Sequence, residues 1–217
     1  MRTSSPAFHS RPSLPERLNQ SLSEAERLAW SDIAAGRPLQ QVLDRVLNAV
    51  ELEADGDLFA SILLVDETGT RLVHGAAPSL PPEYCAAVDG IAIGPGSGSC
   101  GTAAWLGHPV YVIDTRTDPL WADFRELALM HGLRACWSTP LNGADRKVIA
   151  TFAVYYATQR SPTAPELRAI AMISRVARDA IERSRALPAG SVSKPPDALR
   201  SGENWSGGQR EIGADFR

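Results

Sequence analysis

Apolar residues follow two different periods along the chain, and the change between them divides the sequence. From Ser21 onward they recur at i, i+3 and i+4, the pattern of a helix that buries one face. Ser21 and Glu24 have the spacing of a capping box and predict where this helix begins. A second stripe over 39–50 predicts another helix after the break at Gly36. Both stripes have to be buried against a sheet or a partner helix.

Beyond these helices the apolar positions fall into short runs, which indicate strands. The expected strands cover 58–66, 71–76, 110–113, 134–141 and 147–156. Short helices are expected over 81–87, 102–106 and the later part of 118–131. Thr163 and Glu166 form a second capping box that opens a long helix ending near Arg185. Pro140 predicts a bulge or a sheet edge. Hairpin-linked strands flanked by helices give an α+β fold, with helices largely on one face of the sheet.

Composition separates one folded block from its two ends. The chain has 217 residues, of which 44% are hydrophobic and 22% charged, which allows one domain with tails. Residues 1–20 are expected to form a disordered leader, and the tail over 187–217 is rich in Pro, Gly and Ser. The domain is therefore expected over 21–186.

Charge and cysteine content exclude several classes of function. A net charge of −3 gives no bulk positive field for nucleic acid, and the apolar runs are too short to span a membrane. The N-terminus lacks a signal-peptide core, so a cytoplasmic location is expected. Three cysteines make no disulfide framework, and the Cys and His spacing predicts no metal site.

Four stretches carry a resemblance to a known family. They are Gly96–Ala104, the segment from Asp118-Pro119-Leu120-Trp121 through His131–Pro140, Thr151–Tyr156, and Arg160-Ser161-Pro162. In this order they resemble a GAF domain, most closely the sensor GAF domains of bacterial histidine kinases and cyclic-di-GMP signalling proteins. The resemblance implies an antiparallel sheet of five or six strands. Terminal helices would cover one face, and loops and short helices would enclose a ligand cavity on the other.

The resemblance also implies a role in bacterial signal transduction. A stand-alone, non-enzymatic sensor is expected to bind an unidentified small molecule and to signal through its terminal helices. The expected partners are a second copy of the chain in a homodimer and, in trans, a histidine kinase of a two-component system or a cyclic-di-GMP enzyme. The cofactor stays unknown: neither bilin nor a cyclic nucleotide is named as the ligand, because the bilin-anchoring Cys-His pair and the cyclic-nucleotide signature are absent. A pure dimerisation module remains an alternative.

The segment 118–138 is the richest in side chains suited to a ligand cavity, which usually pairs apolar walls with a few polar groups. The predicted ligand-binding residues are Trp121, Phe124, His131, Arg134, Cys136, Trp137 and Ser138. The aromatic residues could equally fill the core. Strand alternation places Arg134, Cys136 and Ser138 on one face and Trp137 on the other.

Two cysteines support a different class of function. Cys100 lies near an expected helix N-terminus, where a thiol becomes more reactive, and Cys136 is the second redox candidate. Ser99–Ala103 resembles a stretch of the GAF-type methionine sulfoxide reductases. The region that would match their catalytic cysteine, 127–130, has no thiol. A thiol-based redox enzyme or sensor therefore remains an alternative to ligand binding. Glycines over 94–101 are interpreted as a tight turn rather than a phosphate loop.

Overall fold

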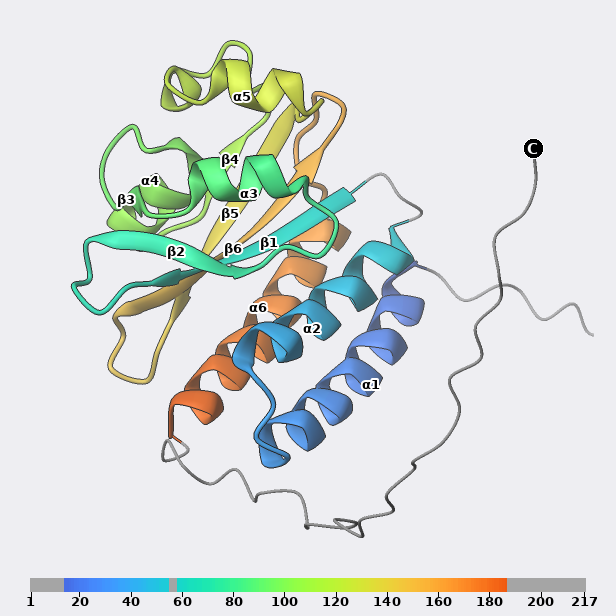
Figure 1. Ribbon diagram of the computed structural model, residues 1–217. Coiled ribbons are helices and arrows are strands. Elements are labelled where there is room, and N and C mark those ends of the chain that lie inside the picture. The colour runs from blue at the N-terminus through green and yellow to red at the C-terminus, as the bar shows by residue number, and fades with distance from the viewer. Residues whose placement is uncertain (1–13, 55–57, 187–217) are drawn as a thin grey trace, which may run out of the picture.

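An antiparallel sheet of six strands separates two layers of helices in the computed structural model, which describes residues 14–54 and 58–186 (Figure 1). The strand order is β3-β2-β1-β6-β5-β4, and every neighbouring pair is antiparallel. The strands are β1 (Leu58–Val65), β2 (Arg71–Ala76), β3 (Ile91–Ala92), β4 (Val110–Val112), β5 (Ala135–Asn142) and β6 (Val148–Tyr156). The predicted α+β class is confirmed. Strand β3 was not predicted, because two residues are too few to show alternation.

Three long helices cover one face of the sheet. They are α1 (Leu14–Ala34), α2 (Leu39–Glu53) and α6 (Ala164–Ala186). Helix α2 packs on β1 and β2, α6 packs on β5 and β6, and α1 lies against both helices (Figure 1). The stripes predicted from the sequence are buried here, with Val46 and Leu47 of α2 meeting Ile173 of α6 in one core. Within the described residues, no helix has the length and apolar character needed to cross a membrane.

Shorter helices cover the opposite face. They are α3 (Pro82–Val88), α4 (Gly98–Leu106), the single 3-10 turn η1 (Pro119–Trp121) and α5 (Arg125–Met130). A second core lies between them and the sheet, and it contains Leu63 of β1, Tyr84 of α3 and Trp121 of η1. The sheet therefore has one core on each face, and β1, β5 and β6 contribute to both.

The two ends of the domain differ from the sequence prediction in part. Helix α1 begins at Leu14, so the predicted leader over 1–20 is wrong for 14–20. Ser21 lies inside α1 and donates to the Glu53 carboxylate instead of capping the helix. Residues 1–13 and the predicted tail over 187–217 lie outside the described residues.

Local signals elsewhere were accurate. Glu166 accepts hydrogen bonds from both the backbone N–H and the hydroxyl of Thr163, as the capping box predicted. Pro140 lies beyond Ser138, the last β5 residue that pairs with β4, so it is locally at an edge. The β5–β6 register shifts between Leu141 and Asn142. A proline that cannot donate to a ladder is tolerated there.

Candidate functional site

A small cavity lies between the sheet and the layer of α3, α4 and η1. Its walls are mostly apolar and come from Leu63, Val88, Ile91, Trp121 and Phe124. Its free volume is about 20 Å³, which is room for roughly one water molecule. No ionised side chain lines it within the described part of the chain. The cavity therefore excludes a metabolite-sized ligand unless a wall moves.

Helix α4 approaches the sheet closely because its inner residues are small. All residues from Gly98 to Ala104 are buried. A Cβ atom at Gly101 would lie 2.5 Å from the Ala92 carbonyl oxygen and 2.5 Å from the Ser97 Cβ, so only glycine fits without rearrangement. This close approach brings the Cys100 side chain to the floor of the cavity.

The sheet face below the cavity carries several hydroxyl groups, of which that of Tyr155 belongs to a residue of the cavity lining. Ser61 of β1 and Ser138 of β5 lie opposite Ala153 of β6 on its two sides, so a small residue separates two serines. The hydroxyls of Ser61 and Tyr155 lie 3.3 Å apart, within hydrogen-bonding distance. Ser138 Oγ and Thr151 Oγ1 are buried and have no partner of normal hydrogen-bond geometry among the described residues.

Two free thiols are buried on this side of the sheet. Cys100 lines the cavity, and Cys136 of β5 lies in the same core. The polar side chains of Cys136, Ser138 and Thr151 around it lower the pKa of the Cys100 thiol, against the effect of burial. Burial, together with the neighbouring Cys100, raises the pKa of Cys136 well above its usual value.

Trp121 connects η1 to the same floor. Its Nε1 donates to Ser99 Oγ over 3.0 Å, and Ser99 Oγ donates to the Cys136 carbonyl oxygen over 3.2 Å. The Trp121 ring packs edge-on against Phe124 at 6.4 Å between centroids. These contacts close the cavity on the η1 side.

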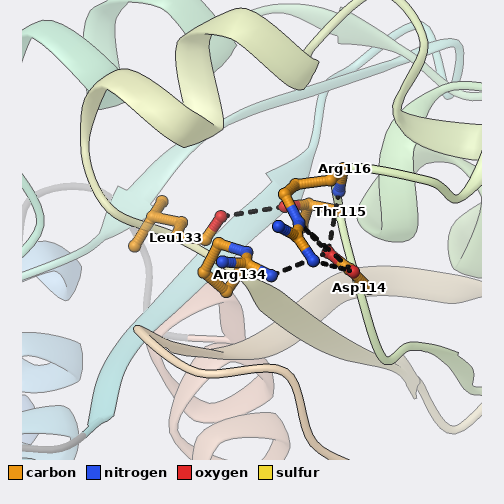
Figure 2. A network of polar contacts seen from close by, with 5 residues as sticks. All are labelled: Asp114, Thr115, Arg116, Leu133 and Arg134. Atoms are coloured by element: carbon orange, nitrogen blue, oxygen red, sulfur yellow. Dashed lines mark hydrogen bonds and ion pairs between the residues drawn. The ribbon is translucent and has the colours of Figure 1, made fainter.

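Arg134, at the start of β5, lies in a different polar network (Figure 2). Its Nη2 atom lies 3.4 Å from Asp114 Oδ1, and Nη2 of Arg116 lies 3.1 Å from Asp114 Oδ2. Hydrogen bonding from Arg116, together with the charge of Arg134, lowers the pKa of Asp114 to about 2. Thr115 donates from Oγ1 to the Leu133 carbonyl over 2.9 Å. The network fastens the loop after β4 to the start of β5.

A sequence model of the GAF domain family matches residues 36–182, which include the cavity and most of both cores. The chain belongs to the GAF domain family. The fold, a six-stranded antiparallel sheet between two layers of helices, agrees with the resemblance drawn from the sequence.

Individual relatives agree with the family assignment. The chain is 35% identical over 187 residues to the methyl sulfide methyltransferase-associated sensor of Methanosarcina acetivorans. This match covers 83% of the chain and only 18% of the sensor. A solved GAF domain is similar with a TM-score of 0.65 at 16% identity, over 82% of this chain and 98% of that one. Free methionine-R-sulfoxide reductase of Neisseria meningitidis has a TM-score of 0.62 at 17% identity, over 83% and 98%. At such identities the two structures show the fold alone.

The GAF domain brings together four of the seven side chains predicted to bind a ligand. Trp121 and Phe124 line the cavity, and Cys136 and Ser138 lie on the cavity face of β5. His131 lies behind the wall, where its ring meets Tyr84 edge-on at 5.8 Å. That these residues bind a ligand stays a prediction.

Trp137 lies on the opposite face of the sheet from the cavity. Its ring is 4.7 Å from that of Tyr156, Arg160 lies over both rings, and its Nε1 donates to the Arg160 carbonyl. A pocket of about 250 Å³ opens nearby between α2, α6 and the sheet, and a wider surface groove of about 770 Å³ runs between α1 and α2. Neither hollow reaches the thiols.

Sequence reasoning missed several cavity residues of this GAF domain, namely Ser61, Tyr84, Ser99, Thr151 and Tyr155. Thr151 and Tyr155 share a parity in β6, so alternation contained a signal for them. The run 148–156 is so uniformly apolar that this signal was not recognised.

Proposed function

We propose that this GAF domain is a sensor that binds a small molecule in the cavity between α3, α4, η1 and the sheet, and transmits binding to its terminal helices. The observation that carries the proposal is the pair of buried hydroxyls, Ser138 Oγ and Thr151 Oγ1, which lie on the sheet face below the cavity and have no partner of normal hydrogen-bond geometry among the described residues. A buried polar group without a partner costs free energy, and a ligand that hydrogen-bonds to it removes that cost. The 35% identical relative that is named a sensor supports the same role.

The lining limits the class of ligand. Apolar walls and a floor of hydroxyl groups, without an ionised side chain, suit a neutral and mostly apolar molecule with one or two hydrogen-bonding atoms. Because the free volume is about 20 Å³, such a molecule enters only if Trp121 and Phe124 move outward with η1. The edge-on contact between these two rings lets them move as one unit.

Strand β5 provides the route to the helices. Cys136 and Ser138 face the cavity, whereas Trp137 between them packs under α6 beside Arg160. Arg160 is ion-paired with Glu166 in the first turn of α6. We propose that a change in β5 reaches α6 in this way. The receiver would be a histidine kinase or a cyclic-di-GMP enzyme in trans, with the domain acting as a homodimer and without catalysis of its own.

Two adjacent hydroxyls of β5 provide the test. Ser138→Ala removes an unpartnered hydroxyl on the cavity face, and Thr139→Val removes one on the helix face. We expect neutral small molecules that stabilise the wild-type protein in a thermal-shift screen to bind Ser138→Ala about five- to tenfold more weakly, the value of one lost hydrogen bond. Thr139→Val should bind them normally. Equal affinity for wild type and both variants would contradict the assignment of the site.

A second measurement tests the proposed homodimer. Native mass spectrometry of the gently purified protein reports its assembly mass and any retained molecule together. A dimer is expected. A dimer that retains nothing and is not stabilised by any compound would favour the alternative of a pure dimerisation module.

A further inference from the structure

We propose that the pocket between α2, α6 and β6 is a second ligand site, on the opposite face of the sheet from the cavity at α3, α4 and η1. Its ligand is an uncharged molecule with an apolar body of about eight carbon atoms and a carbonyl head. This inference concerns a site other than the proposed sensor cavity and does not depend on it. The lining of the pocket and the hydrogen bonds of Arg160 carry it.

The pocket is already open in the structure and has the size of a small ligand. Its volume is about 250 Å³, against about 20 Å³ for the cavity on the other face. An apolar protein cavity of about 150 Å³ holds benzene, so this pocket suits a molecule of roughly ten non-hydrogen atoms. Its apolar lining comes from α2, β6 and α6, and consists mainly of Val50, Val154, Ala169, Ile170 and Ile173. The pocket therefore holds such a body without the outward movement of η1 that the other cavity requires.

Arg160 supplies a polar end to the pocket, and several contacts fix its position. Its backbone N–H donates to the Ile113 carbonyl over 3.2 Å, and its own carbonyl accepts from Trp137 Nε1 over 3.3 Å. Its Cζ atom lies 4.3 Å from the centre of the Tyr156 ring, and its Nη2 donates to the Glu166 carboxylate. A donor held in this way is ordered before a ligand arrives, which lowers the cost of binding.

The guanidinium of Arg160 has hydrogen-bond donors left over. Of its three nitrogens, only Nη2 has an acceptor within the described residues, and that acceptor is Glu166. Both oxygens of Glu166 are already used. Its Oε1 accepts from Arg160 and the Tyr156 hydroxyl, and its Oε2 accepts from the backbone N–H and the hydroxyl of Thr163. Nε and Nη1 of Arg160 can therefore donate to an oxygen of a ligand, and a carbonyl group supplies one.

The charges around the pocket favour an uncharged head. Besides Arg160, the carboxylates of Glu166 and Glu53 line it. Arg160 is ion-paired with Glu166, and Glu53 accepts a hydrogen bond from the Ser21 hydroxyl. A ligand carboxylate would meet two like charges, and a ligand ammonium would meet the guanidinium. A neutral carbonyl group avoids both repulsions and still accepts from Arg160.

The pocket lies where a ligand acts on the terminal helices directly. Val50 belongs to α2, Ile173 belongs to the middle of α6, and Glu166 lies in the first turn of α6. A molecule bound among them contacts both helices and the Arg160–Glu166 ion pair at once. The second site therefore gives the domain an input that does not pass through β5.

Methyl NMR of the full-length protein tests the site, with octanamide as the probe. Labelled methyl groups of Val50, Val154 and Ile173 report the pocket, and those of Leu63 and Ile91 report the cavity on the other face. We expect octanamide to shift the first set of signals in a saturable way and to leave the second set unchanged. Shifts confined to the cavity set, or no saturable shift up to the solubility limit of octanamide, would overturn the proposal.

Two further probes test the head group. Octanoate and octylamine have the same alkyl length as octanamide, but at neutral pH they carry a negative and a positive charge. Each should bind at the pocket at least about fivefold more weakly than octanamide, since each meets a like charge there. Equal or tighter binding of either charged probe would overturn the assignment of an uncharged ligand.

Single variants test the lining. Ala169→Phe fills the pocket from a half-buried position on α6 and should abolish the octanamide shifts. Ala171→Phe is the matched control, because Ala171 is exposed on the same helix, and it should bind octanamide as the wild type does. Arg160→Met removes the donors and should weaken binding about tenfold. Wild-type affinity in Ala169→Phe or in Arg160→Met would contradict the site. The methyl signals of the wild-type protein decide the proposal even if a variant fails to fold.

Discussion

Asp114 shows how a single charged residue fixes a loop next to the cavity. Its carboxylate is only 5% exposed, and it receives hydrogen bonds from the side chains of Arg116 and Arg134 and from the Arg116 backbone N–H (Figure 2). Arg134 lies directly before β5, the strand that carries Cys136 and Ser138. The network therefore holds the β4–η1 connection to the start of β5.

The Asp114 network predicts a pH-dependent stability. The pKa of Asp114 in the folded protein is about 2, below the unfolded value of about 3.9. Its ionised form therefore stabilises the fold above about pH 4, and that stabilisation is lost as the pH falls toward 2. Asp114→Asn should unfold at lower urea concentration than wild type at pH 7, and the difference should shrink below about pH 4.

Urea unfolding across pH 2 to 7 measures this difference. The control is Asp123→Asn, which changes an exposed aspartate in the segment between η1 and α5. It should follow the wild-type curve at each pH. A deficit of Asp114→Asn that stays constant across the whole range would show that the carboxylate charge is not what stabilises the loop.

The direction of a side chain was predicted correctly where strand alternation determines it. The prediction failed where a partner far away in the sequence determines it. Alternation correctly put Cys136 on one face and Trp137 on the other. The same alternation argued against grouping Trp137 with the cavity residues, and its indole lies in the helix-side core. Arg134 was predicted to face a ligand, but it pairs with Asp114. This partner lies twenty positions earlier in the chain, and no local sequence pattern reveals such a pair.

Helix α4 is the element on which the cavity depends most. It was predicted to begin at residue 102 because the glycines before it disfavour helix formation. It begins at Gly98, since close packing on β5 and β6 outweighs that preference. The predicted start of helix α1 was too late, because the sequence around Ser21 has the spacing of a capping box. In the structure Ser21 lies within a continuous helix that begins at Leu14. Capping and propensity signals are local, and tertiary packing overrules both.

Gly101 tests this account of α4. Gly101→Ala places a Cβ atom 2.5 Å from the Ala92 carbonyl oxygen, so α4 or β3 must shift, at a cost of about 1–3 kcal/mol. Gly94→Ala is the matched control, because a Cβ there meets no atom within 4 Å. It should leave stability unchanged or raise it by up to about 1 kcal/mol. Chemical denaturation compares the two variants, and equal stability would show that α4 is free to move away from the sheet.

At the scale of the whole molecule, the sheet is a single layer shared by two cores. β5 and β6 place cavity residues on one face and helix-packing residues on the other, so a shift of either strand is felt on both sides. The sequence predicted these two faces and the three long helices. It did not predict how small the cavity is, because its volume depends on η1 packing against α4 from far along the chain.

An artificial ligand tests whether the two cores are coupled. Trp121→Ala leaves an apolar space the size of an indole ring, and such spaces in protein cores bind small aromatic molecules. Indole should therefore bind this variant and raise its melting temperature. Trp105→Ala, which removes an exposed tryptophan from the end of α4, should give no such site.

Fluorine NMR of the 5-fluorotryptophan-labelled Trp121→Ala protein then reports the helix face. Indole binding should shift the resonance of Trp137, because β5 joins that ring to the cavity floor through the adjacent Cys136 and Ser138. Trp30, whose ring lies under Arg183 between α1 and α6, should shift as well if α6 moves. Replacement of each tryptophan by phenylalanine assigns the signals. If indole stabilises the variant but neither the Trp137 nor the Trp30 resonance shifts, the two cores are not coupled. Binding in the cavity would then not reach the terminal helices through β5.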